Sequence, residues 1–433
     1  MGLQIADWAR QEHPQSTIRN PKSLGCGMRS RHSLTTDRWL ILSSAGLRAA
    51  AVGLSGILLT LHLTTLNFSA WSLGWAVSLG LAGCAIGTAL VTCTADRVGR
   101  RATLIALAVL MACGGVALAC LTRASLIMMS VLVGMVNGMG RDRGAGLTVE
   151  QALLPQTTVA SERTVAFAWY NLVIDAGHAV GALLGAIPAL LRAHTGVSMV
   201  ASYQWTWGLY SLLCVASGCF AAALSSSVER YRAGAVRRLS PASRSIIAKF
   251  AVLSGIDSLG GGFLTTAMVS YWFFRRFGVD EAVLAPVFCA ARVANGVSHL
   301  AAAWLAKRIG LVNTMVWTHL PSSLLLMTVP WAPSLTVAIV LFLIRESLVE
   351  MDVPTRQSYL VAMVKEDERI RASGVTNLTR SVAWAVAPAA AGMMMRSLWL
   401  SAPLVVGPGL KIAYDVLLYR VFRHLKTPEE QGK

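Results

Sequence analysis

The chain has 433 residues, of which 55% are hydrophobic and only 14% are charged, and its mean hydropathy is +0.57. Soluble domains carry about 25% charged residues, so this composition excludes an ordinary soluble protein and indicates one that crosses a membrane. A net charge of +17 suggests a nucleic-acid partner, but the whole excess lies in the loops and tails. The charge therefore indicates orientation in a membrane, and we expect no nucleic-acid partner.

Twelve apolar stretches are long enough to cross a bilayer, which takes about 20 residues. They cover roughly residues 39–66, 70–94, 102–122, 125–154, 164–191, 203–225, 247–274, 282–305, 311–330, 333–354, 370–395 and 399–421. The sequence thus predicts an all-α membrane protein of twelve transmembrane helices in two six-helix bundles. Its expected parts are an N-terminal tail (1–38), a first bundle (39–225), a basic linker (226–246), a second bundle (247–421) and a C-terminal tail (422–433).

Both tails are expected to face the cytoplasm. The two tails and the connections that follow even-numbered spans contain, with their flanking residues, 25 Lys and Arg residues. The connections that follow odd-numbered spans contain five. Connections rich in basic residues stay on the cytoplasmic side of a membrane. Residues 1–38 contain no apolar core of a signal peptide. We expect a multi-pass protein of the inner or plasma membrane, or of a membrane derived from it. The eight scattered cysteines lack metal-site spacing, so neither a metal nor another cofactor is expected.

A short charged segment between the second and third spans must lie at the membrane surface, because a cluster of this kind cannot sit in lipid. Its charged residues and glycine are Asp96, Arg97, Gly99, Arg100 and Arg101. A copy that lacks the carboxylate recurs 211 residues later at 306–310. Further matches, Glu162-Arg163 with Glu368-Arg369, are 206 residues apart. The repeat predicts two related six-helix halves with a binding cavity between them, exposed alternately to each side.

This loop resembles the signature of the major facilitator superfamily, Gly-x-x-x-Asp-Arg-x-Gly-Arg-Arg. All positions match except the first, where Thr92 replaces the glycine, and the resemblance extends over residues 39–421. It implies the twelve-helix transporter fold, with the loop as a gate that locks the cytoplasmic side by touching the start of the eleventh span. The expected partners are the bilayer and a small-molecule or ion substrate. The sequence leaves the oligomeric state open, with a monomer as the working expectation.

Sixteen charged residues lie within or close to the predicted spans, eight of each sign. An unpaired charge at the centre of a membrane helix costs roughly 2.5–3.5 kcal/mol, so most must pair or face water. The basic ones are Arg48, Arg141, Arg143, Arg292, Arg345, Arg356, Arg380 and Lys411. The acidic ones are Asp142, Glu150, Asp175, Asp257, Glu346, Glu350, Asp352 and Asp415.

The deeper charges of the fourth and tenth spans are candidates for the cavity wall or for structural pairs. They are Arg141, Arg143, Arg345 and Glu346. Arg143 and Glu150 are two helical turns apart and are expected to share a face. Glu150 and Arg356 lie near the ends of their spans, where a structural role is favoured.

The fifth span carries a polar stripe of Asn171, Asp175 and His178. An Asp and a His one turn apart suit proton handling, whereas a structural contact between helices is the alternative and a metal site would need more ligands. The same span carries glycines at a four-residue spacing, which predicts close packing against another helix. They are Gly177, Gly181 and Gly185.

Asp257 in the seventh span is followed by three consecutive glycines at 260–262. Each weakens a helix by roughly 1 kcal/mol, and a discontinuous helix beside a carboxylate is typical of a substrate or ion site. The alternative is a packing notch in which Asp257 pairs with Arg292 or Arg48.

Two further features lie in the last two spans. In the eleventh span, Arg380 shares a face with Trp384 and suits an anionic group, or else neutralises Glu346 or Asp175. In the twelfth span, Lys411 and Asp415 are four residues apart and are expected to pair with each other.

Together these patterns predict a secondary transporter of a small polar or ionic solute, not an enzyme. The sequence holds no phosphate loop for ATP, so an ion gradient is the expected energy source. Proton coupling would use Asp175 with His178, or Asp257, or Glu346. A metal ion or metal chelate is an alternative substrate, and a non-transporting scaffold or sensor is the alternative function.

Overall fold

The computed structural model describes residues 27–158, 163–225, 241–353, 355–356, 359 and 369–422, and every regular element in these ranges is a helix. The first half contains α1 (Gly27–Thr65), α2 (Ala70–Val98), α3 (Arg100–Cys120), α4 (Ala124–Val133), α5 (Ala145–Leu153), α6 (Arg163–Leu184), α7 (Ile187–Thr195) and α8 (Met199–Ala222). The second half contains α9 (Pro241–Gly262), α10 (Thr266–Phe277), α11 (Glu281–Ile309), α12 (Leu311–Thr328), α13 (Leu335–Val349), α15 (Arg369–Ser397) and α16 (Pro403–Phe422).

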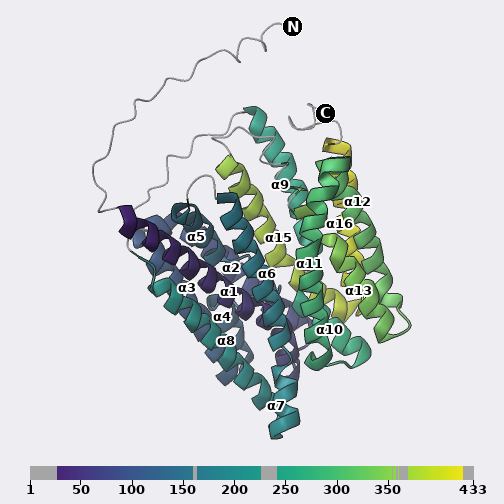
Figure 1. Cartoon of the computed structure of the whole chain (residues 1–433). Coiled ribbons are helices and arrows are strands. Elements are labelled where there is room, and N and C mark those ends of the chain that lie inside the picture. Colours follow the sequence, from purple (N-terminus) through teal and green to yellow (C-terminus); the bar gives the residue numbers. More distant parts are fainter. Residues whose placement is uncertain are drawn as a thin grey trace.

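The helices run back and forth between two sides of the molecule (Figure 1). We call the side where α1 begins and α16 ends the terminal side. It also carries the tight turns at Gly99 and Gly310, where positive φ angles of 101° and 87° suit glycine. The opposite side, which we call the far side, carries the connections α1–α2, α3–α4, α7–α8 and α10–α11. In Figure 1 the terminal side is uppermost, α3 and α8 lie at one edge, and α12 and α13 at the other.

Seven helical segments among the described residues are long and apolar enough to cross a membrane on length and composition alone. They are Thr35–Thr65, Ala70–Val98, Arg100–Cys120, Val165–Thr195, Met199–Ala222, Arg244–Phe277 and Glu281–Ile309. The other predicted spans fall on helices that are broken, shorter, more polar or more charged. Most of the charges expected at the cavity lie in these spans.

The fourth span is not the continuous helix that the apolar run predicts. It is divided into α4 and α5 by the non-helical segment 134–144, which contains four glycines. One of them, Gly140, has φ of +69°, a conformation that favours glycine. A Cβ atom there would lie 2.5 Å from Oγ1 of Thr266, so a close approach also excludes a side chain.

The seventh span is interrupted where the glycine run weakens it. Its first part, α9, ends at Gly262, and Thr265 then caps α10 by accepting a hydrogen bond from the backbone of Met268 at 3.3 Å. The expected discontinuity is confirmed. The fifth span also breaks, after Leu184, and resumes as α7 with Pro188 in its first turn.

The two interrupted spans dock on each other and join the two halves. The backbone N–H of Ala267 donates to the carbonyl of Gly138 at 3.0 Å. The hydroxyl of Thr266 donates to the carbonyl of Met139 at 2.9 Å. Backbone groups left free by each break are therefore satisfied by the other half, as membrane proteins require.

Glycines also set the closest helix contacts within the first half. A Cβ on Gly177 would lie 2.5 Å from the carbonyl oxygen of Gly46, and one on Gly181 would lie 2.0 Å from that of Ala50. The close packing predicted from the glycine spacing of the fifth span is confirmed, with α1 as the partner of α6.

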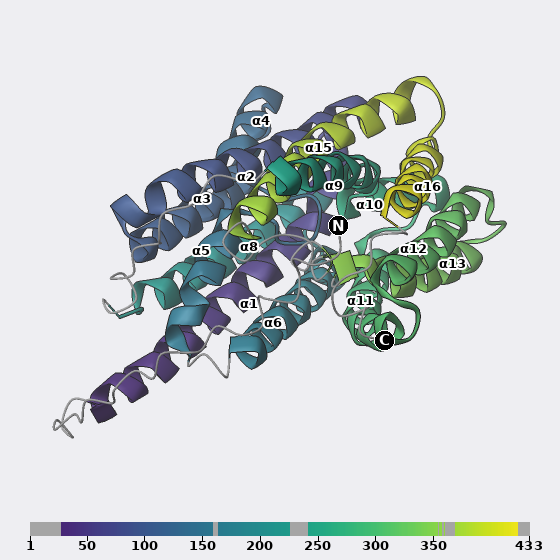
Figure 2. The ribbon, with the colours of Figure 1, turned by 90° about the horizontal axis from the view of Figure 1, so that it is seen from above.

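On the far side the two halves meet tightly along α2 and α15, which run side by side in Figure 2. A Cβ on Gly74 would lie 2.4 Å from the carbonyl oxygen of Pro388, and one on Gly392 would lie 2.3 Å from that of Ala70. On the far side of the molecule, α2 and α15 therefore approach so closely that their backbones touch, which closes the space between the two halves there.

An ion pair adds to this seal. Arg192 of α7 lies 2.6 Å from Glu281 at the start of α11, and the hydroxyl of Tyr203 donates to the same carboxylate at 2.9 Å. Glu281 is only 1% exposed. The two halves are thus held together on the far side by both packing and charge.

Candidate substrate cavity between the two halves

A cavity of about 400 Å³ lies between α5 and α6 of the first half and α11 and the end of α13 in the second. Polar side chains line it, among them Gln151, Asn171, Asp175, His299 and Glu350. These residues lie from the middle of their spans toward the terminal side. The cavity therefore extends toward that side, opposite the sealed contacts.

A deeper pocket of about 100 Å³ lies in the middle of the molecule and is lined by many charged side chains. Its basic residues are Arg141, Arg143, Arg292, Arg345, Arg356, Arg380 and Lys411. Its acidic residues are Asp257, Glu346, Glu350 and Asp352. We call this the deep pocket. Most of the site residues predicted from the sequence are brought together here, although Asp175 and His178 line the larger cavity instead.

Within the first half, Arg48 of α1 organises a buried cluster that we call the Arg48 cluster. Its Nε atom lies 2.6 Å from Asp142 and its Nη2 atom 2.6 Å from Glu150, which also accepts a hydrogen bond from Tyr170 at 2.9 Å. Glu150 is fully buried. These bonds match the structural interpretation of Glu150 but not its expected alignment with Arg143. That expectation was wrong because residues 141–144 are not helical, so helical spacing does not apply to them.

Within the second half, Asp257 of α9 lies among three cations in what we call the Asp257 cluster. Its carboxylate is 2.7 Å from Nζ of Lys411, 3.0 Å from Nη1 of Arg356 and 3.4 Å from Nη1 of Arg380. Arg356 also pairs with Asp352 at 2.7 Å. The alternative interpretation of Asp257 named Arg292 or Arg48 as its partner, and both assignments were wrong. Pairing across helices depends on the packing of α9 against α15 and α16, which spacing does not reveal.

The expected pair of Lys411 and Asp415 was also wrong. The amine of Lys411 turns to Asp257 and to Nε2 of His319, at 3.2 Å, while Asp415 bonds to Nδ1 of His319 at 2.9 Å. His319 of α12 was not singled out from the sequence. The sequence shows only a single His in an apolar span, which does not identify its partners. Those partners follow from the packing of α12 against α16.

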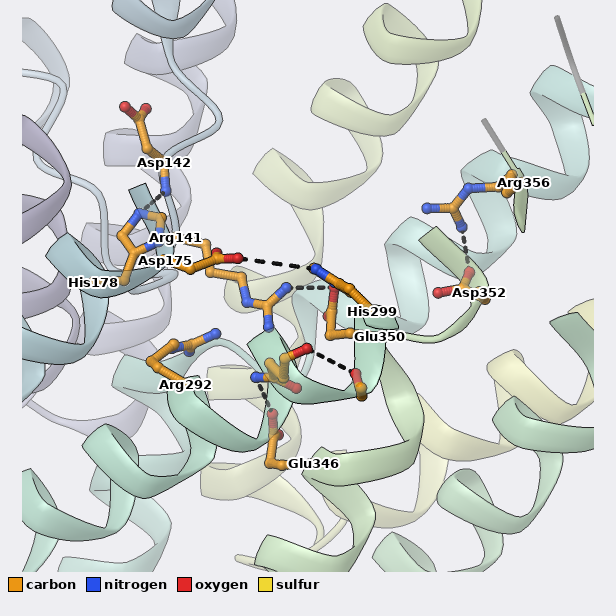
Figure 3. A network of polar contacts seen from close by, with 12 residues as sticks. Arg141, Asp142, Asp175, His178, Arg292, His299, Glu346, Glu350, Asp352 and Arg356 are labelled. Carbon is orange, nitrogen blue, oxygen red and sulfur yellow. Dashed lines mark hydrogen bonds and ion pairs between the residues drawn. The ribbon is translucent and has the colours of Figure 1, made fainter. Parts of the chain in front are cut away.

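Among the described residues, three further contacts made by side chains of the two pockets link the halves in the middle of the molecule, and Figure 3 shows two of them. Arg141 lies 2.5 Å from Glu350, and Asp175 lies 3.9 Å from Nδ1 of His299. In the third, the guanidinium of Arg143 lies 5.0 Å from the centre of the Trp384 ring. All three join a residue of the first half to one of the second.

The structure gives Asp175 and His178 different partners instead of pairing them with each other. Nε2 of His178 accepts a hydrogen bond from the backbone N–H of Asp142 at 2.8 Å (Figure 3). The ring is thereby fixed within the first half. Asp175 faces His299 instead, and the side chains of this pair are 36% and 33% exposed.

The remaining pocket residues form shorter links within the second half. Arg345 bonds to the adjacent Glu346, whose other oxygen accepts from the amide of Asn295 at 2.9 Å. Arg292 donates to the hydroxyl of Thr266 at 2.9 Å. Among the described residues, Arg292 and Arg143 form no ion pair with a carboxylate, so both add positive charge to the pocket.

The charged loop between α2 and α3 is paired within itself. Asp96 lies 2.9 Å from Arg100, which also donates to the carbonyl of Ala152 at 3.2 Å. Asp96 and Arg97 are exposed, whereas Arg100 is buried. The side chains of residues 369–371 at the start of α15 lie outside the described residues, as do Glu162 and Glu368 of the repeat. The locking contact with the eleventh span therefore stays a prediction.

The residues that line the cavity do not resemble a metal centre. Within the described part of the chain, no group of three or more His, Cys, Asp or Glu side chains is placed to hold a metal ion. The arginines of the deep pocket would repel a bare cation.

Comparison with known proteins identifies the family to which this chain belongs. The family model described as Major Facilitator Superfamily matches residues 41–388. A relative from Saccharomyces cerevisiae, the uncharacterized membrane protein YJR124C, is 23% identical over 420 residues, covering 89% of this chain and 94% of that protein.

Solved transporter structures show the same fold. The inward-open conformation of the xylose transporter XylE from E. coli matches with a TM-score of 0.70 at 15% identity, covering 91% of this chain and 99% of that one. A crystal structure of the nucleoside transporter NupG matches with a TM-score of 0.69 at 12% identity, covering 89% and 99%. From its helices, its central cavity and these matches, the chain is a membrane transporter of the Major Facilitator Superfamily.

Proposed function

We propose that this transporter carries a small polar or ionic solute by alternating access, driven by a proton gradient. The observation that carries the proposal is a charged cavity that extends from the midplane toward the terminal side, while the far side is sealed. A binding site in the middle with access from one side is what alternating access requires of one of its two end states.

We infer that the terminal side faces the cytoplasm, as the distribution of Lys and Arg predicts. On this assignment the structure is the inward-facing state. The contacts broken on conversion to the outward-facing state would be the α2–α15 seal and the pair of Arg192 with Glu281. The outward-facing state would in turn close the terminal side, with the Asp96–Arg101 loop as the proposed gate.

The cavity distinguishes this proposal from the scaffold hypothesis. A scaffold needs its intramembrane charges only as dry, fully matched pairs, whereas here the two halves enclose about 400 Å³ lined by charged and polar groups. Polar residues at this depth are costly in lipid, and water-filled space between the halves reduces that cost. A metal-ion substrate is less well supported, because the walls of the deep pocket are mainly basic.

Asp175 is the best-placed group for proton coupling. It lies at the cavity, 3.9 Å from His299 of the other half. A carboxylate attracts a protonated imidazole more strongly than a neutral one. Protonation of His299 would thus strengthen the link between the halves at the cavity, and loss of the proton would weaken it. Asp257 and Glu346 are already held by cations of their own half.

The test is solute uptake into proteoliposomes with and without an inward proton gradient, using a panel of organic anions, sugars and nucleosides. We expect one class to accumulate only with the gradient. In Asp175→Asn, accumulation should be lost while exchange of solute across the membrane without a gradient persists. If no solute moves in any form of the assay, transport is disproved. If Asp175→Asn still accumulates solute, the proton assignment is wrong.

A further inference from the structure

Resting on the proposed function, a substrate class follows from the walls of the deep pocket. We propose that the pocket binds a small oxyanion, a carboxylate or phosphate, between Arg143 of the first half and Arg380 of the second. The indole of Trp384 forms the platform on which both guanidinium groups lie.

The first argument is charge. Seven basic side chains line the deep pocket against four carboxylates. Two of the carboxylates are matched one to one, Glu350 by Arg141 and Glu346 by Arg345. Asp257 and Asp352 are shared by three further cations, and Arg143 and Arg292 add two more. A neutral solute would leave this excess uncompensated and a cation would increase it, whereas an anion reduces it.

The second argument is the geometry around Trp384. The guanidinium carbons of Arg143 and Arg380 lie 5.0 and 4.7 Å from the centre of the same ring. Stacking on an aromatic face holds a guanidinium in place while its N–H groups remain free at the ring edge. Two such groups beside one indole form a prearranged set of donors that matches the planar or tetrahedral oxygens of an oxyanion.

The third argument is that these donors are incompletely used. Nε of Arg143 is buried and has no hydrogen-bond partner among the described residues. Arg380 has the longest of the three bonds to Asp257, at 3.4 Å against 2.7 and 3.0 Å. A buried donor without a partner is costly, so a bound oxyanion would satisfy groups that the protein itself leaves open.

The position of the pair links binding to the transport cycle. Arg143 lies in the non-helical segment of the fourth span, and Arg380 lies on α15. An anion held between them would contact both halves at once, as a substrate must do to favour the occluded state over either open state. The pocket volume of about 100 Å³ suits an ion of a few heavy atoms, while drug-sized ligands need about 300–1,000 Å³.

The test is equilibrium binding to the purified full-length protein in detergent, by calorimetry at constant ionic strength. The probes are inorganic phosphate, acetate and succinate, with choline and glucose as cationic and neutral controls. We expect at least one of the anions to bind and the controls not to bind. Preference for phosphate or for the carboxylates then identifies the source of the oxyanion.

Three variants and one control locate the site. Arg143→Gln and Arg380→Gln should each weaken anion binding at least tenfold, and Arg380→Lys should recover only part of it because Lys lacks the planar donor set. Arg123→Gln removes the same charge from an exposed far-side position and should leave binding unchanged. Equal weakening in Arg123→Gln, or no binding by any of the three anions, would overturn the proposal.

The outcomes separate this inference from the proposed function. Anion binding that depends on Arg143 and Arg380, without flux in proteoliposomes, would support the pocket and disprove transport of these ions. Gradient-driven flux of a neutral solute that survives in Arg143→Gln and Arg380→Gln would support transport and disprove the anion pocket.

Discussion

The Arg48 cluster and the Asp257 cluster are both buried groups of charges, but they are built differently. In the Arg48 cluster, one cation bonds to two carboxylates, and Tyr170 and the backbone of Gly144 complete the set. In the Asp257 cluster, one carboxylate is divided among three cations. The first cluster is closed within one half, whereas the second lines the deep pocket.

We propose that this difference separates charges with a structural role from charges that take part in transport. Every polar group around Arg48 is assigned to a neighbour of the same half, so its role is to hold α1 against α5 and α6. Around Asp257, three cations share one carboxylate, and on the proposal above Arg380, which has the longest of these contacts, turns to the anion when it binds. Redundant pairing lets a substrate bind without leaving a buried charge unpaired, which would cost several kcal/mol.

The largest effect should come from breaking the closed cluster. Arg48→Met replaces the guanidinium side chain with an unbranched apolar one. Asp142 and Glu150 are then left without their cation. Loss of one partner from a buried ion pair costs about 3–5 kcal/mol. We expect a large fall in thermal stability in detergent, measured by the loss of monodisperse protein on heating. Stability equal to that of the parent protein would contradict a structural role for this cluster.

A smaller effect is expected in the redundant cluster. In Lys411→Met, Asp257 keeps Arg356 and Arg380, so the loss should be nearer that of one charged hydrogen bond, about 1.5–3 kcal/mol. The same heating assay compares it directly with Arg48→Met. If Lys411→Met is the less stable of the two, the contrast between closed and redundant clusters is wrong.

The smallest effect is expected at the exposed loop. Asp96 pairs with Arg100 across one helical turn and its side chain is 51% exposed, so Asp96→Asn should cost about 0.3–0.5 kcal/mol. Asp96→Asn should reduce the rate of uptake by more than this small loss of stability would cause, because the predicted locking contact belongs to the outward-facing state. Stability and uptake are measured on the same preparation. A loss of uptake that merely follows a loss of stability would argue against the gate.

The order of the spans could be predicted from the apolar runs, and the interruption of the seventh span and the close contact of α6 from the positions of glycines, because each depends on local sequence. The interruption itself follows directly after the glycine run, at 263–265. The partners of individual charges could not be predicted in this way. Arg143 and Glu150 separate because the chain unwinds at 134–144, where docking on α10 outweighs the helical tendency of the apolar run.

Likewise, spacing suggested Lys411 with Asp415 and Asp175 with His178. Local pairs of this kind contribute only about 0.2–0.5 kcal/mol, so a better-placed partner on another helix displaces them. His319 and His299 are these partners. The sequence identified most of the residues of the cavity, and the packing of the helices decided how they pair.

Alternating access requires that the two halves exchange one sealed side for the other. Gly74 offers a way to drive that exchange without a substrate, because a side chain there would collide with the backbone of α15. Gly74→Val should therefore open the far side. Gly208→Val is the matched control, since a Cβ at Gly208 meets nothing within 4 Å.

The most direct measurement is the distance between pairs of spin labels, determined by pulsed electron paramagnetic resonance. The native cysteines are first replaced, so that labels attach only at introduced cysteines. Labels at Arg97 and Arg308 report on the terminal side, and labels at Thr195 and Pro333 on the far side; all four positions are exposed. In Gly74→Val the terminal-side distance should shorten and the far-side distance should lengthen, while Gly208→Val leaves both unchanged. If the two distances in Gly74→Val stay fixed or change in the same direction, alternating access between these halves is contradicted.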